Sequence, residues 1–190
     1  MTEKRKVRAP VALVPQEALP SRGRLGFCPA PGRWRVDPRV EPGRLLDEDL
    51  ASLRAGGVTT LVVLLEEEEM ARIGLAGLRE HARRAGLEVL WFPFRDGTAP
   101  PDPEATAFLV QRILDRLASG RTVVVHCHGG IGRSGTIVAA CLVASGTDPA
   151  RALELVRAER PAAATAFGQE EFVHAFAALW RRTGGARQGF

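Results

Sequence analysis

The sequence has little of what marks several special classes of protein. Its three cysteines, Cys28, Cys127 and Cys141, are too few for a disulfide framework. It contains no apolar run of about 18 residues, which a membrane-spanning helix would need, and no apolar signal core near its start. We therefore expect a protein of the reducing cytoplasm.

Aromatic residues are also scarce, at 6% of the 190 residues, and no segment interleaves basic with aromatic side chains. A formal net charge of +4 would otherwise suggest a nucleic-acid partner. The arginines are scattered, however, and the densest basic group lies at residues 4–8, close to the start. We therefore expect neither a nucleic acid nor a membrane as partner, and interpret the arginines as part of a solvated surface.

Apolar runs and amphipathic segments alternate along the chain. Short apolar runs predict buried strands at 58–65, 87–92 and 121–125. Helical spacing or a capping residue predicts helices at 48–55, 75–84, 103–119, 136–145, 148–160 and 169–182. Asp47 is expected to cap the first of these helices and Asp148 the fifth. The alternation predicts an α/β fold, with a central, mainly parallel β-sheet flanked by helices on both faces.

All of these elements fit one domain at residues 22–182. Residues 1–21 carry three prolines and are expected to form a flexible N-terminal arm, and the Gly/Arg-rich residues 183–190 a disordered tail. Residues 24–36 look like an irregular edge segment. In the helix at 103–119, the apolar face is expected to comprise Phe108, Leu109, Ile113, Leu114 and Leu117.

The stretch at 121–138 carries the strongest functional signal. A β-branched strand is followed by a loop with three glycines and then by an apolar helix. Such a loop can turn its backbone N–H groups toward one point, and the helix directs its positive end to the same point. The sequence therefore predicts an anion-binding loop. It lacks the Gly-Lys-Ser/Thr string of a nucleotide-binding loop.

Two reactive side chains lie at the ends of this loop. The N–H donors would stabilise a thiolate on Cys127, and the planar guanidinium of Arg133 can hold two oxygens of a phosphate. The string from His126-Cys127 to Arg133-Ser134-Gly135 resembles the signature loop of the cysteine-dependent protein tyrosine and dual-specificity phosphatases. Together with residues 26–32 and 96–102, it is similar to the cyclin-dependent kinase inhibitor 3 (kinase-associated phosphatase) type of this superfamily.

The resemblance implies a dual-specificity-phosphatase-like fold and hydrolysis of phosphomonoesters through a cysteinyl-phosphate, with no cofactor and no metal ion. Cys127 would be the nucleophile, Asp96 the general acid with Asp102 as its rival, and Ser134 a donor to the sulfur. Gln169 would either hold the attacking water or simply begin a helix. His126 would orient the loop. The phosphate would be bound by the loop residues His128, Gly129, Gly130, Ile131, Gly132 and Arg133.

Other polar residues allow further interpretations. The four glutamates at 66–69 are interpreted as a solvated charge run rather than a metal site, although relatives carry an acidic loop beside the active site. His81 and His174 are expected to be surface or packing residues. Cys141 is expected to pack in the core, whereas Cys28 is a less favoured redox partner for Cys127.

The substrate class is predicted from the interior of the loop. No lysine lies between Cys127 and Arg133, which favours a phosphorylated protein or peptide over a phosphoinositide, and the short chain favours a shallow, dual-specificity site. Two alternatives stay open. One is a phospho-binding module without catalysis, and the other is a rhodanese-like sulfurtransferase, which also uses a loop cysteine.

Overall fold

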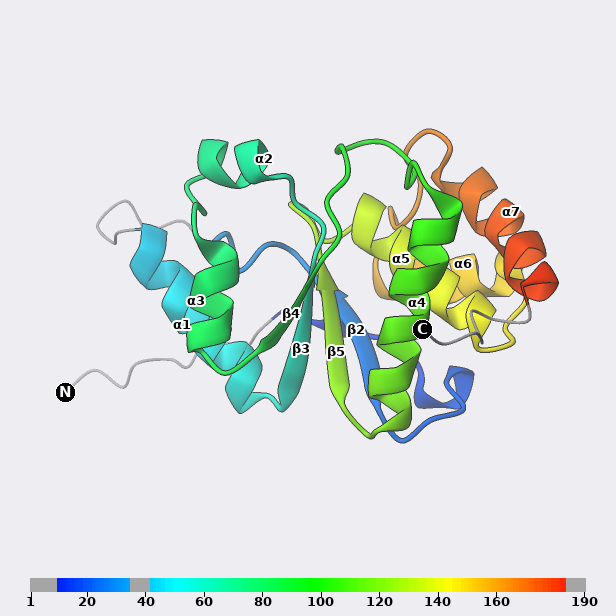
Figure 1. Ribbon diagram of the computed structural model, residues 1–190, viewed down its shortest axis with the longest axis horizontal. Helices are drawn as coiled ribbons and strands as arrows, with labels where there is room; N and C mark the ends of the chain where they lie inside the picture. The colour runs from blue at the N-terminus through cyan, green and yellow to red at the C-terminus, as the bar shows by residue number, and fades with distance from the viewer. Residues whose placement is uncertain (1–9, 35–41, 184–190) are drawn as a thin grey trace.

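The computed structural model describes residues 10–34 and 42–183. A five-stranded sheet of order β1-β2-β5-β3-β4 forms its centre (Figure 1). The strands are β1 (Ala12–Leu13), β2 (Arg24–Cys28), β3 (Val58–Val63), β4 (Glu88–Trp91) and β5 (Thr122–His126). Only the pairing of β1 with β2 is antiparallel. The prediction of an α/β fold with a mainly parallel sheet is therefore confirmed.

Helices cover both faces of the sheet, as predicted. They are α1 (Pro42–Ala55), α2 (Glu67–Arg72), α3 (Leu78–Arg84), α4 (Pro103–Ala118), α5 (Gly132–Ala144), α6 (Pro149–Glu159) and α7 (Gln169–Arg182), with a short 3-10 helix at Gln16–Ala18. Figure 1 shows α1 and α3 on one face, and α4, α5, α6 and α7 on the other. No helix within residues 10–34 and 42–183 is long and apolar enough to cross a bilayer.

Two apolar clusters hold the layers together, one on each face of the sheet. On β5, Val123 and Val125 join the cluster that includes α4, α5 and α7, while Val124 joins the cluster of α1 and α3. This alternation follows from the two-residue repeat of a strand. β5 lies between β2 and β3, so the segment that follows His126 leaves the middle of the carboxyl edge of the sheet, where parallel sheets commonly place their ligand sites.

The N-terminal third differs from the prediction. Residues 24–28 form β2, an inner strand next to β5, and not an irregular edge segment. Gly26 explains how β1 fits beside it, because a Cβ at this position would lie 2.7 Å from the carbonyl oxygen of Ala12. Within the expected N-terminal arm, Ala12 and Leu13 form β1 and pair with Phe27 and Gly26 of β2. Residues 1–9 and 184–190 lie outside the described residues.

Two further side chains correct the prediction. α1 begins at Pro42, so Asp47 lies inside this helix and does not cap it; its carboxylate lies 2.6 Å from Nδ1 of His81 on α3. Phe108 was expected on the buried face of α4 but is 63% exposed. Elsewhere the predicted cap is confirmed, since the Asp148 carboxylate accepts hydrogen bonds from the N–H groups of Ala150 and Arg151.

Candidate active site

Residues 127–132, which follow β5 and include the first residue of α5, are here named the Cys127 loop. α5 begins at Gly132, four residues earlier than predicted, so Arg133 and Ser134 belong to its first turn. The backbone N–H groups of a first helical turn have no partner within the helix and carry its positive end. The loop and the helix start therefore form a place suited to an oxyanion.

The shape of the Cys127 loop is fixed by close packing on the loop after β2. Gly130 has a φ of +66°, and a Cβ there would lie 2.3 Å from the carbonyl carbon of Cys28 and from the nitrogen of Pro29. Beside it, the Ala30 N–H donates to the carbonyl of His128 at 3.0 Å. Only glycine fits at position 130, because any side chain would collide with backbone.

A buried carboxylate holds the loop after β2 in turn. Oδ2 of Asp49, on α1, accepts a hydrogen bond of 2.7 Å from the N–H of Gly32, and Asp49 is buried. The indole N–H of Trp34 donates to the carbonyl of Pro29 at 2.9 Å. The Cys127 loop therefore rests on a second loop that is itself tied to α1. The residue pattern before β3 gave no sign of this role for Asp49.

Cys127 is nearly covered, with 2% of its surface exposed, and its Sγ lies 3.5 Å from the hydroxyl of Ser134. His126 is fully buried, and its Nδ1 lies 3.3 Å from the carbonyl oxygen of Cys127. Burial lowers the pKa of His126 to about 4, so the ring is neutral near pH 7. A neutral ring with its proton on Nδ1 would donate to that carbonyl.

Arg133 is completely buried and is held by Glu69. Its Nη1 and Nη2 donate to the two carboxylate oxygens of Glu69 at 2.7 Å each. Nη1 also donates to the carbonyls of Leu64 and Phe94. Burial opposes the charge on Arg133, but the bonds to Glu69 outweigh it and raise the pKa of Arg133. Burial opposes the charge on Glu69 as well, but the hydrogen bonds and the positive charge of Arg133 outweigh it and lower the pKa of Glu69. Both groups are therefore charged.

Glu69 corrects the interpretation of residues 66–69. Glu67 and Glu68 are exposed, as expected of a solvated run, but Glu69 is only 4% exposed and points inward. Residues 67–69 of the run form the first turn of α2 rather than a loop, and a helix directs successive side chains to different sides. A buried arginine requires a carboxylate partner, so Arg133 was the signal that would have pointed to Glu69.

The two candidates for the general acid, Asp96 and Asp102, lie in different surroundings. Oδ1 of Asp96 lies 3.1 Å from Nη2 of Arg133, and its side chain is 68% exposed. Asp102 instead accepts hydrogen bonds of 2.9 Å from the N–H groups of Glu104 and Ala105, at the start of α4. Asp96 thus lies at the Cys127 loop, whereas the Asp102 carboxylate is used as a helix cap.

Gln169 is buried although it begins α7, so it is not a surface glutamine. Its Nε2 donates to the carbonyl of Thr98 at 2.9 Å, and its Oε1 accepts from the N–H of Ala166. A Cβ on Gly132 would lie 3.2 Å from both amide atoms. Gln169 therefore joins the Cys127 loop to the loop that carries Asp96.

The other two cysteines are buried, and burial raises the pKa of each thiol well above its ordinary value. Cys28 ends β2 in register with His126, so it lies on the strand next to the one that leads to Cys127. Cys141 lies inside α5, in the core, as expected.

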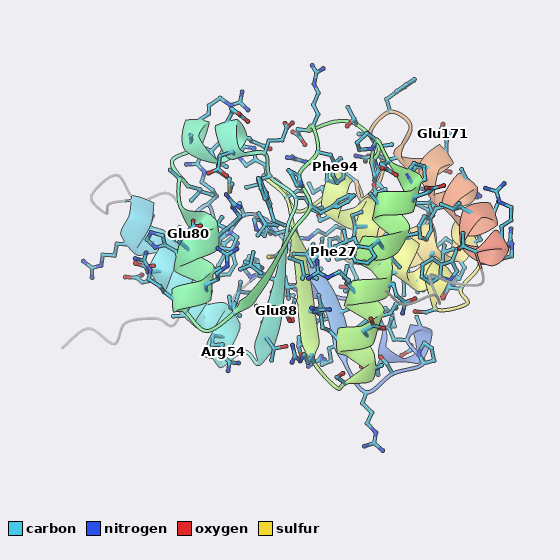
Figure 2. The ribbon with its side chains drawn as sticks, viewed as in Figure 1. Phe27, Arg54, Glu80, Glu88, Phe94 and Glu171 are labelled. Atoms are coloured by element: carbon cyan, nitrogen blue, oxygen red, sulfur yellow. The ribbon has the colours of Figure 1, made fainter. Side chains whose placement is uncertain are left out.

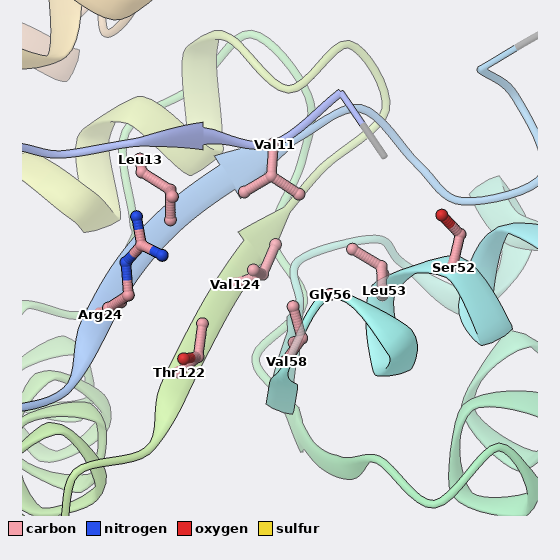
Figure 3. Close-up of a pocket in the computed structure, with 9 residues that line it drawn as sticks. All are labelled: Val11, Leu13, Arg24, Ser52, Leu53, Gly56, Val58, Thr122 and Val124. Carbon is pink, nitrogen blue, oxygen red and sulfur yellow. The ribbon is translucent and has the colours of Figure 1, made fainter. Parts of the chain in front are cut away.

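A separate cavity of about 240 Å³ lies between α1 and the strands β1, β2, β3 and β5 (Figure 3). Its lining residues are Val11, Leu13, Arg24, Ser52, Leu53, Gly56, Val58, Thr122 and Val124. Thr122 and Val58 begin their strands, whereas the Cys127 loop follows the other end of β5. None of the site residues predicted from the sequence lines this cavity.

Comparison with curated proteins points to one class of enzyme. Cyclin-dependent kinase inhibitor 3 of Rattus norvegicus and that of Homo sapiens are each 28% identical over 156 residues, which is 80% of this chain and 71% of each relative. Protein tyrosine phosphatase type IVA 2 of Mus musculus is 29% identical over 60% of the chain and 65% of that protein.

Solved structures agree with this class. The kinase-associated phosphatase with its catalytic-site cysteine replaced by serine superposes with a TM-score of 0.80 at 20% identity, over 98% of this chain and 100% of that one, which shows a shared fold. Tk-PTP in its active form is 30% identical, with a TM-score of 0.65, over 83% of this chain and 92% of that one.

The family model described as "Polymorphic toxin system, DSP-PTPase phosphatase" matches residues 40–147, more than half of the chain. This match contains β3, β4, β5, the Cys127 loop and all of α5. The chain therefore belongs to this family and is a protein tyrosine/dual-specificity phosphatase.

Proposed function

We propose that this phosphatase hydrolyses phosphomonoesters on proteins or peptides through a cysteinyl-phosphate, without a metal ion. One observation carries the proposal. Arg133 lies in the first turn of α5, six residues after Cys127, and its guanidinium is 3.1 Å from the carboxylate of Asp96. A nucleophile, a fixed cation and a carboxyl group that can carry a proton are thus gathered at one loop.

In the first step, the thiolate of Cys127 attacks phosphorus, and the bond between phosphorus and the ester oxygen breaks. Asp96, protonated, gives its proton to the leaving oxygen. Arg133 and the N–H groups of the Cys127 loop, at residues 128–132, would hold the three remaining oxygens. Such fixed donors stabilise the charge that builds up in the transition state. His126 would keep the loop in shape through the carbonyl of Cys127.

In the second step, water attacks the phosphorus of the cysteinyl-phosphate, and the sulfur leaves. Asp96, now ionised, accepts the proton of that water, so acid and base are one residue. The hydroxyl of Ser134, 3.5 Å from Sγ, would donate to the departing sulfur. Gln169, between the Cys127 loop and the Asp96 loop, would orient the water. Cys127 must stay reduced for this chemistry, which fits a reducing compartment.

The test is phosphate release from para-nitrophenyl phosphate in the presence of EDTA. We expect turnover by the wild type and none by Cys127→Ser, which should still bind the phosphate analogue tungstate. Asp96→Asn should reduce kcat by about a hundredfold or more on a phosphopeptide, whose leaving group needs the proton. Asp102→Asn is the matched control and should stay within about threefold. Binding of phosphopeptides without release of phosphate would replace the enzyme mechanism by a phospho-binding role.

A further inference from the structure

Four large hydrophobic side chains are exposed within the described residues, namely Trp91, Phe108, Ile131 and Phe167. Two of them are partly covered by arginines. The guanidinium of Arg79 lies 3.8 Å from the centre of the Trp91 ring, and that of Arg112 lies 5.9 Å from the centre of the Phe108 ring. Phe167, by contrast, is 94% exposed. Aromatic side chains are enriched at protein interfaces relative to the rest of the surface, so the position of Phe167 relative to the Cys127 loop decides what it can bind.

Phe167 belongs to a segment that borders the active site on two sides. The N–H of Ala164 points at the carbonyl of Ile131, at 3.5 Å, and the side chain of Gln169 packs on Gly132. On the other side, a Cβ on Gly168 would lie 3.7 Å from the Cβ of Ala99, in the loop that carries Asp96. Phe167 therefore extends into solvent from the rim of the Cys127 loop.

The second exposed side chain at this rim is Ile131, which lies inside the Cys127 loop and is 37% exposed. Phe167 and Ile131 come from two segments in direct contact, and neither side chain fills the interior. They form an apolar rim, a name used below for these two residues. When the phosphate of a substrate is bound in the Cys127 loop, the remainder of the substrate would lie beside this rim.

We propose that the apolar rim binds an apolar side chain that flanks the phosphorylated residue of a protein substrate. This inference rests on the proposed function and narrows its substrate class. The phosphate would be held by the Cys127 loop, and the flanking side chain would cover the ring of Phe167. Burial of such a pair removes apolar surface from water, which favours binding without acting on the reacting atoms.

Exposed charges of both signs surround the site: Arg95 precedes Asp96, and carboxylates lie on α2 and α7. Glu68 is exposed on α2, the helix whose Glu69 holds Arg133. Glu171 is exposed in the first turn of α7, two residues after Gln169, and Figure 2 shows it at the end of the molecule where α2 also lies. These carboxylates would repel an anionic membrane and attract basic residues of a peptide. The phosphatase PTPMT1, which has been solved in complex with PI(5)P, is a structural neighbour at 24% identity, so lipid is included in the test.

The experiment is a double-mutant cycle between enzyme and substrate. Two phosphotyrosine peptides differ only in the residues on either side of the phosphotyrosine, which are leucine in one and alanine in the other. Phe167→Ala should lower kcat/KM about tenfold on the leucine peptide, through KM, and less than about threefold on the alanine peptide. Phe167→Leu should restore at least half of the loss. Thermal melting confirms that each variant is folded.

Phe108→Ala is the matched control, because Phe108 is also an exposed phenylalanine but lies on α4, and it should change both peptides less than about twofold. Equal losses on the two peptides, or an equal loss on para-nitrophenyl phosphate, would overturn the inference. A larger loss on phosphoinositide in anionic vesicles than on the leucine peptide would also overturn it. If wild type releases phosphate from none of these substrates, the proposed function itself has failed.

Discussion

Glu69 and Arg133 meet through two parallel hydrogen bonds of 2.7 Å, and both side chains are buried. The pair joins α2 to the first turn of α5 across 64 residues of sequence. Because a guanidinium out of contact with water needs a fixed counter-charge, Glu69 determines whether Arg133 can stay in place. Glu69, which holds the guanidinium of Arg133 in position, therefore belongs to the site together with Arg133.

Removal of Glu69 should therefore damage both stability and activity. We expect Glu69→Ala to lower the free energy of unfolding by about 3 kcal/mol, because it leaves a buried unpaired charge, and to raise the Kd for tungstate. Urea denaturation and tungstate titration measure the two effects. Glu68→Ala, next to it but exposed, should stay within about 0.5 kcal/mol of wild type. Equal destabilisation by the two variants would contradict the role of the pair.

Gly130 should not tolerate a methyl group. Its φ of +66° and the 2.3 Å approach of a Cβ to the peptide between Cys28 and Pro29 leave no place for one. Gly130→Ala should lower the free energy of unfolding by at least about 2 kcal/mol. At Gly129 a Cβ would meet nothing closer than 3.9 Å, so Gly129→Ala should be destabilised much less. Urea denaturation of the two variants measures this difference. Equal destabilisation by Gly130→Ala and Gly129→Ala would show that close packing on the peptide between Cys28 and Pro29 does not fix the loop.

Asp102 should affect stability and leave the chemistry alone. Its carboxylate caps α4 through two hydrogen bonds of 2.9 Å, so Asp102→Ala should lower stability by about 1 kcal/mol. Asp148→Ala, at the equivalent cap of α6, should do the same. In thermal unfolding both variants should melt several degrees below wild type, while the pH dependence of kcat stays unchanged. If the pH profile of kcat changes in Asp102→Ala, Asp102 would again be a candidate for the general acid.

His126 should make the protein sensitive to moderate acid. Its pKa is about 4 in the folded protein and near 6.5 when unfolded, so protonation favours unfolding. Its contribution is complete above pH 6.5 and is lost as the pH falls toward 4. Between pH 7.5 and 4.5, wild type should lose roughly 2 to 3 kcal/mol more than His126→Gln, which cannot titrate. Parallel losses in the two proteins, measured by urea denaturation, would rule out this role.

The elements that could be predicted from the sequence are those with a strong local pattern. The apolar runs of β3 and β5 and the capped helices α4 and α6 stand out because residues near in sequence decide them. β2 escaped prediction because its five residues contain Gly26 and are followed by a proline. Its place beside β5 depends on a pairing across about a hundred residues, which no local pattern contains.

The residues of the site also fall into those that a local pattern predicts and those that it does not. Cys127, Arg133 and Ser134 occupy one loop and one helical turn, so their spacing alone is enough to predict a role for them. Asp96 as the general acid stays a prediction, although its carboxylate lies 3.1 Å from Arg133, and the sequence did not point to Glu69 or Asp49. Both are carboxylates whose partners lie outside their own helices, 17 residues away for Asp49 and 64 for Glu69, and on their own helices they look like ordinary surface acids. Only the folded chain shows which acidic side chains turn inward.

The central position of β5 has a consequence for how the protein loses activity. Val123, Val124 and Val125 have a neighbouring strand on each side and no exposed surface. Their amide protons should exchange with deuterium only when the whole domain opens, while those of β4, at the edge, exchange through smaller openings. The Cys127 loop is anchored to the slowest-exchanging strand, so partial unfolding of the peripheral elements should leave this loop in place.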